Sequence, residues 1–152
     1  MADSKVTLLI ENWIRQNYLH EKYGQLFDKK KLALSPGGSF EFDAVSKNES
    51  IVASISTSAN KTAGGKKAAG PFRKILADIL YLNMIDDTQH KVNERLIVFT
   101  EKDLHGRFLQ EFNAGRIPKN VQFILVEDIA ADLRKQLAVF RSKASKEVSP
   151  FK

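Results

Sequence analysis

The sequence predicts an α/β fold, a three-layer sandwich with helices on both faces of a mixed five-stranded sheet. Residues 39–58 alternate between apolar and polar on both sides of a short polar turn, which is typical of two paired strands. Residues 95–100 and 121–126 are continuous apolar runs, as expected for strands that are covered on both faces. The segments between these runs have apolar residues at helical spacing, so we expect helical crossovers and parallel pairing.

The first half of the chain predicts a helix followed by a meander of three strands. The helix can be capped by Asp3 or Ser4 and stopped by Gly24. A short strand at 30–34 then turns at Ser-Pro-Gly-Gly, residues 35–38, into the central hairpin. Connections this short require antiparallel pairing.

The second half predicts two crossover helices and a last helix. Segment 59–70 has three glycines and no hydrophobic period, so we expect a mobile loop. The next helix opens at Gly70-Pro71, where the missing N–H of proline costs nothing. A third helix is expected around 104–112, ending at Gly115, and a last one over 129–140.

The chain has 152 residues, which predicts one domain over 1–142 and a disordered polar tail at 143–152. It has no cysteine, which excludes disulfides and thiolate metal sites and is compatible with the reducing cytoplasm. No stretch has the length and apolarity of a membrane span, and residues 1–13 are expected to begin a helix, not a signal peptide. We therefore expect a cytoplasmic protein without a membrane partner.

The formal net charge is +6, which suits a polyanionic partner such as DNA. One group of cations, at residues 29–31, is most simply a solvated turn. A second group falls in the glycine-rich segment and at the start of the helix after it: Lys61, Lys66, Lys67, Arg73 and Lys74. This group is either a solvated surface or a clamp on a phosphate backbone, and such a clamp would be sequence-independent and sensitive to salt.

Polar side chains on the central hairpin provide the candidate site. If its two strands pair, Asp43 projects from the first strand, and Ser54 and Ser56 project from the second. Glu41 shares the face of Asp43, because one residue separates them. The serines lack a nucleophile signature, since there is no G-x-S-x-G motif. His20, His90 and His105 have no zinc-binding spacing.

The order of elements and the position of Asp43 resemble the restriction-endonuclease-like superfamily, the PD-(D/E)xK nucleases, over roughly residues 6–140. This resemblance implies an aspartate on the second strand and a Glu-x-Lys pair on the third, with the acids on magnesium and the lysine assisting the attacking water. Asp43 matches the aspartate, but the pair falls on Ser54-Ile55-Ser56, so both its glutamate and its lysine are replaced. Glu11 could correspond to a glutamate that some members carry on the first helix.

This departure leaves three hypotheses open. The leading one is a DNA-binding protein on a restriction-endonuclease-like fold with a degraded catalytic site. The second is a Mg²⁺-dependent DNA endonuclease with a rearranged site, in which Asp43, Glu41 and Glu11 hold the metal. Its lysine would be supplied by Lys61 or Lys74, and magnesium is expected only in this case. The third is a non-enzymatic interaction or scaffold module, including a homodimer.

Overall fold

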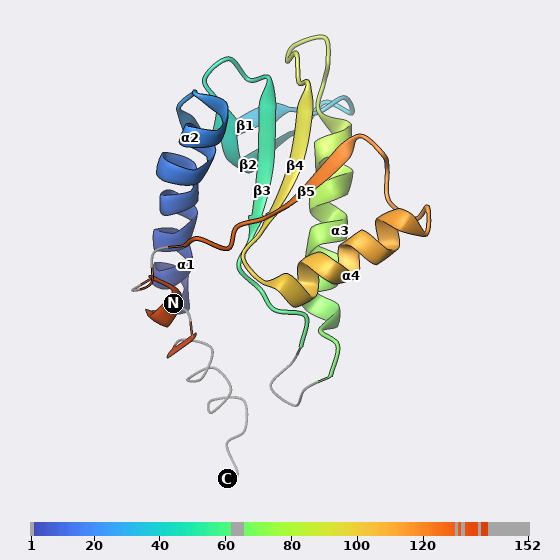
Figure 1. The fold of residues 1–152 in the computed structure, drawn as a ribbon. Helices are drawn as coiled ribbons and strands as arrows, with labels where there is room; N and C mark the ends of the chain where they lie inside the picture. The colour runs from blue at the N-terminus through green and yellow to red at the C-terminus, as the bar shows by residue number, and fades with distance from the viewer. Residues whose placement is uncertain (1, 62–65, 130, 132, 137, 140–152) are drawn as a thin grey trace.

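The protein was described from a computed structural model, which covers residues 2–61, 66–129, 131, 133–136, 138 and 139, with side chains from residue 5 onward. It contains one five-stranded mixed sheet in the order β1-β2-β3-β4-β5 (Figure 1). The strands are β1 (Phe27–Ala33), β2 (Ser39–Ser46), β3 (Ile51–Ser56), β4 (Glu94–Phe99) and β5 (Val121–Leu125). The first three pair antiparallel and the last two continue parallel to β3. The predicted mixed five-stranded sheet and its parallel crossovers are therefore confirmed.

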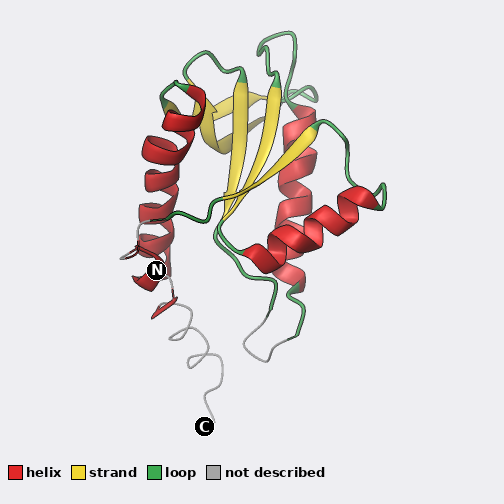
Figure 2. Ribbon diagram, in the orientation of Figure 1, coloured by secondary structure: helices red, strands yellow, loops and turns green. Residues whose placement is uncertain are grey.

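Helices cover both faces of this sheet (Figure 2). One face carries the N-terminal helical segment, and the other carries the two crossover helices. These elements are α1 (Ala2–Trp13), the π-helix η1 (Ile14–Leu19) and α2 (His20–Tyr23), then α3 (Ala69–Met84) and α4 (Lys102–Asn113). Two apolar cores result, one around Ile10 and Ala53 under α1 and a larger one around Phe42, Ile79 and Phe99 under α3 and α4. The described residues between 131 and 139 are also helical.

The N-terminal helix differs from the single regular helix predicted. It ends at Gly24, as predicted, with the glycine in the left-handed conformation at φ 68°. Its middle is wound as a π-helix, and this segment buries Ile14, Arg15 and Leu19.

Other boundaries shift by a few residues. β1 begins three residues earlier than predicted, at Phe27, and α3 begins at Ala69. Pro71 is consequently the third helical residue, still in the first turn, where backbone N–H groups have no intrahelical acceptor. β5 lies at one edge of the sheet, and its residues 123–125 are only half-buried, whereas residues 96–99 of the interior strand β4 are fully buried.

Two predicted segments, residues 62–65 of the loop and the tail at 143–152, lie outside the described residues. Within the part of the chain that is described, no helix is long and apolar enough to cross a membrane.

Candidate functional site

The central hairpin opens into a fork at Asp43. Asp28 lies opposite Val45 and Lys30 lies opposite Phe42, so two residues of β2, Asp43 and Ala44, face the single Lys29 between them. This is a β-bulge on β2, a feature that often occurs beside active sites because it redirects a side chain. β2 and β3 pair at Ala44–Ala53 and Val45–Val52 and separate beyond these pairs. We call residues 42–44 of β2 and 54–56 of β3 the strand fork.

Asp43 is held in the fork through both its side chain and its backbone. Its Oδ2 accepts a hydrogen bond from the backbone N–H of Ile55 at 2.8 Å, where a paired strand would otherwise supply a carbonyl. Its backbone carbonyl accepts a hydrogen bond from Nη1 of Arg15 at 2.7 Å. The bulge thus leaves backbone groups without a strand partner, and side chains take their place.

Arg15, in the π-helix, joins the first helix to the fork. Its side chain is almost fully buried, and besides Asp43 it donates to Oδ1 of Asn12. Its Nη1 lies 3.7 Å from Oε1 of Glu11. A buried guanidinium needs several acceptors, and these three fix its orientation. Arg15 therefore links Glu11 to the backbone of Asp43.

Glu11 is largely buried, with a side chain 13% exposed. Burial raises the pKa of its carboxyl, and the negative charge of Asp43 raises the pKa further. The charges of Arg15, Lys29 and Lys74 act in the opposite direction. Glu11 is the carboxylate that the sequence offered as a metal ligand from the first helix, and the structure brings it within the electrostatic influence of Asp43.

The charge of Asp43 also affects Asp78 in α3, on the opposite face of the sheet. Burial raises the pKa of Asp78, and the charge of Asp43 adds to this. Nζ of Lys74, one turn earlier, lies 3.4 Å from Oδ2 of Asp78 and lowers the pKa. The charge of Asp43 therefore raises the pKa of one carboxylate in each helical layer.

Sequence reasoning missed Asp78 and Arg15. Asp78 does carry a signal, because it interrupts the apolar stripe of α3 between Ile75, Ile79 and Leu82, all of which are buried. An acid at a core position is uncommon unless it is paired or functional. Arg15 had no comparable signal, since its burial depends on the π-helix.

The remaining predicted residues divide into those near the fork carboxylates and those elsewhere. Lys74 acts on both Glu11 and Asp78, whereas Lys61 is not among the charges that shift their pKa values. Glu41 is exposed and its Oε1 lies 3.8 Å from Nζ of Lys29. Of the two candidates for a migrated lysine, the geometry therefore favours Lys74.

The two serines of β3 add no charge to the fork. Ser54 is buried, and Ser56 is half-buried with its Oγ accepting from the N–H of Ser58 at 3.4 Å. The basic residues of the loop and helix start, Lys61, Lys66, Lys67 and Arg73, are exposed.

The donor set at the fork fits magnesium in kind. Glu11, Asp43 and Asp78 offer hard carboxylate oxygens, and Mg²⁺ is usually bound by one or two carboxylates together with waters and substrate phosphates. Among the residues that the structure describes, no three His, Asp or Glu side chains lie close enough to form a metal site by themselves. Asp43 with Glu11 or Asp78 would therefore be the protein ligands, and the remaining positions would belong to water and phosphate.

Comparison with models of protein families, with curated proteins and with solved structures finds no match to this chain.

Proposed function

We propose that the protein is a Mg²⁺-dependent DNA endonuclease whose site is rearranged around the strand fork. The observation that carries this proposal is that Asp43 is held in the β-bulge by Ile55 and Arg15. Its charge also raises the pKa values of two buried carboxylates, Glu11 and Asp78. The order of elements and the aspartate on the second strand support it, because both resemble the restriction-endonuclease-like superfamily.

The electrostatics of the fork favour a bound cation. Burial and the negative charge of Asp43 raise the pKa values of both Glu11 and Asp78, so the ionised cluster is costly without further positive charge. A divalent cation would offset this cost. When bound, it would supply positive charge to a phosphate and lower the pKa of an attacking water.

The protein groups have separate roles in this proposal. Asp43 is fixed by Ile55 and Arg15, so its carboxylate would be a well-oriented ligand. Glu11 or Asp78 would complete the carboxylate set. Lys74 would take over the task of the lysine that Ser56 replaces, holding the attacking water or a phosphate oxygen through its ammonium group.

The proposal is tested by incubating supercoiled plasmid with the protein in Mg²⁺ or Mn²⁺, with EDTA as the metal-free control. We expect cleavage by the wild type and by Asp87→Asn, whose exposed acid lies in the turn after α3. We expect none from Asp43→Asn, in which an amide replaces the central carboxylate. Absence of cleavage with both ions, or undiminished cleavage by Asp43→Asn, would contradict the proposal.

A second candidate function is DNA binding without cleavage. It is favoured by the partners that the carboxylates already have within the protein: Arg15 for Glu11, Lys74 for Asp78 and the N–H of Ile55 for Asp43. Such pairs allow the fold to persist without metal. Salt-dependent retention of DNA in gel shifts, combined with no heat of Mg²⁺ binding in calorimetry, would select this function over the first.

A further inference from the structure

The segment after β3 is closed at its base. The N–H of Ala68 donates to the carbonyl of Asn60 at 2.6 Å, and Lys61 forms an isolated antiparallel bridge with Lys67. We call residues 60, 61 and 66–68 the basic neck, because its three lysines are all exposed. The neck brings Lys61 and Lys67 together although five residues separate them in the chain.

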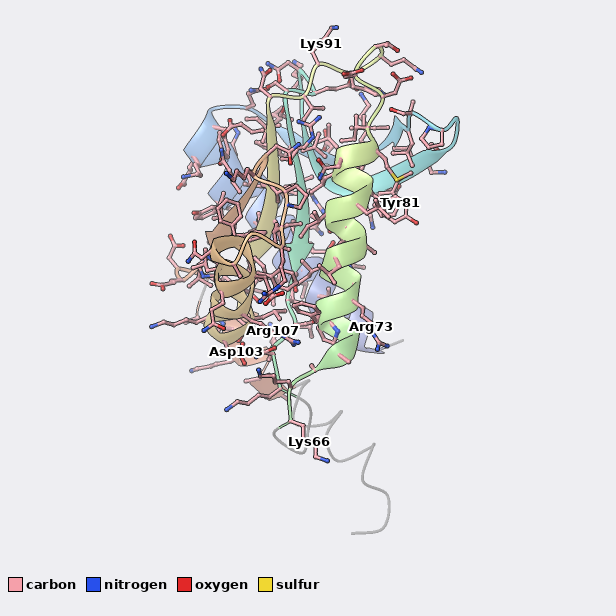
Figure 3. The ribbon with its side chains drawn as sticks, turned by 90° about the vertical axis from the view of Figure 1, so that its right-hand side faces the viewer. Lys66, Arg73, Tyr81, Lys91, Asp103 and Arg107 are labelled. Atoms are coloured by element: carbon pink, nitrogen blue, oxygen red, sulfur yellow. The ribbon has the colours of Figure 1, made fainter. Side chains whose placement is uncertain are left out.

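Helix α4 holds the neck through two side chains. Oδ2 of Asp103 accepts a hydrogen bond from the N–H of Asn60 at 3.0 Å. Nη1 of Arg107 donates to Oδ1 of Asn60 at 3.0 Å and to the carbonyl of Ala68 at 3.3 Å. Arg107 thus joins the two strands of the neck, and Figure 3 shows it and Asp103 beside the start of α3, with Lys66 beyond them.

Arg107 is itself fixed by an aromatic stack. Its guanidinium carbon lies 3.8 Å from the ring centre of Phe72 in α3, a cation–π contact. The ring of Phe72 stacks on Phe108 at 4.8 Å. Arg107 therefore has little freedom to move, and the neck it binds is tied to both α3 and α4.

The bridge has a local electrostatic cost. Like charges directly opposite each other in an antiparallel pair are destabilising, and Lys61 and Lys67 occupy such positions. The hydrogen bonds that Asp103 and Arg107 form with Asn60 and Ala68 oppose this cost by fixing the residues that flank the two lysines. A phosphate near both ammonium groups would relieve their repulsion, which the neck alone cannot do.

We propose that Asp103 and Arg107 are positioning residues for binding the phosphate backbone of duplex DNA, because they hold Lys61 and Lys67 side by side. This inference rests on the proposed function, which makes DNA the partner. It goes beyond that function by making an acidic residue necessary for binding a polyanion.

Because Asp103 is acidic, its removal allows a test in which the change in net charge and the loss of positioning have opposite effects on DNA affinity. Asp103→Ala and the control Asp87→Ala each raise the formal net charge by one. Charge alone predicts tighter binding of a short duplex by both variants. Positioning predicts that Asp103→Ala binds about tenfold more weakly, with a salt dependence smaller by one to two phosphate contacts, as lysine contacts are lost. The Asp87→Ala variant should bind at least as tightly as the wild type.

A second pair of variants keeps the net charge constant. Arg107→Lys cannot reproduce the forked donor geometry or the stack on Phe72, so it should also weaken binding. Arg116→Lys makes the same exchange at an exposed ion pair with Glu111 beyond the end of α4, and should leave binding unchanged. Circular dichroism establishes that each variant is folded, and if Asp103→Ala is not, the arginine pair decides.

The outcomes separate the inference from the proposed function. If the wild type binds DNA and Asp103→Ala binds as tightly as Asp87→Ala, or Arg107→Lys as tightly as Arg116→Lys, the positioning role is wrong and DNA binding stands. If the wild type shows no salt-dependent binding, both are wrong.

Discussion

Acidic residues are held in two different ways around the strand fork and in the turn after β2. The pKa values of Glu11 in α1 and Asp78 in α3 are raised, first by burial and, in both cases, also by the charge of Asp43 in the fork. In the turn after β2, the pKa of Glu49 is lowered, because Lys30 and His90 form hydrogen bonds with its carboxylate. The protein therefore stabilises the ionised form of Glu49 and destabilises the ionised forms of the fork acids.

The partners of Glu49 explain this difference. Its two oxygens lie 2.6 Å from Nζ of Lys30 and 2.8 Å from Nδ1 of His90. Nε2 of His90 in turn accepts from the N–H of Ala33 at 3.0 Å, so Nδ1 carries the proton that Glu49 accepts. This network fastens the edge strand β1 to the turn before β3 and to the connection before β4. The hydrogen bonds and charges of Lys30 and His90 thus favour the ionised form of Glu49, whereas burial disfavours the ionised forms of Glu11 and Asp78.

The largest effect is expected from removing the cation that the fork does have. Arg15→Ala leaves Glu11 and the carbonyl of Asp43 without their buried donor, which should lower the free energy of unfolding by about 3 kcal/mol. Urea denaturation at pH 7 measures this. Arg116→Ala breaks an exposed pair that solvent screens, so it should cost much less than Arg15→Ala. Equal losses in the two variants would show that Arg15 does not organise the fork.

The next largest effect separates activity from stability at Asp78. Asp78→Asn removes one of the carboxylates proposed to hold the metal, so it should lower plasmid cleavage by about a hundredfold. The same substitution should raise the free energy of unfolding, whereas most substitutions of buried residues lower it. Because the pKa of Asp78 is raised on folding, its ionised form costs stability at neutral pH, and an amide removes this cost.

Urea midpoints at pH 7 and initial cleavage rates in Mg²⁺ measure the two effects of Asp78→Asn. If Asp78→Asn loses stability and keeps full activity, Asp78 is a structural acid stabilised by its partners, as Glu49 is. The proposed difference between the two regions would then be wrong. Asp87→Asn, an exposed acid in the turn after α3, should change neither quantity.

Local patterns in the sequence predicted the sheet well and the site only in part. Burial on each strand is visible in the alternation of β2 and β3 and in the apolar run of β4. The strands and the position of Asp43 could therefore be predicted from the sequence without knowledge of tertiary contacts. The bulge could not, because it depends on register between β1 and β2, which the alternation does not encode. A strict alternation placed Glu41 beside Asp43, whereas Glu41 pairs with Lys29 in the structure.

The effect of Asp43 on Asp78 was beyond local patterns for a related reason. It depends on how α3 packs on the sheet through core residues such as Ile75 and Ile79. The convergence of Glu11 could only be posed as a question, because it depends on Arg15 and the π-helix. In this chain, the residues that were hardest to predict are those whose positions depend on irregular backbone.

A smaller effect is expected at Glu49. Glu49→Gln weakens the bonds from Lys30 and His90 and should lower the free energy of unfolding by about 1 kcal/mol at pH 7. Since the pKa of Glu49 is lowered on folding, this contribution is present above its unfolded pKa and disappears as pH falls through the folded value. Urea midpoints between pH 7 and pH 3 should therefore converge for the wild type and the variant. A difference that stays constant over this range would mean that charge is not involved.

The smallest effect, at Glu11, has the opposite dependence on pH. Glu11→Gln resembles the protonated acid, and the folded protein favours that form because the pKa of Glu11 is raised. The variant and the wild type should be about equally stable in acid. As pH rises through the unfolded and then the folded pKa, the wild type should lose stability relative to the variant. Added Mg²⁺ should restore the wild type at neutral pH and affect the variant less, because a bound cation favours the ionised carboxylate. Two Glu→Gln exchanges in one protein would thus give stability differences that change with pH in opposite directions. If both differences changed in the same direction, Glu11 would belong to a structural network like that of Glu49, and the proposed metal site would be contradicted.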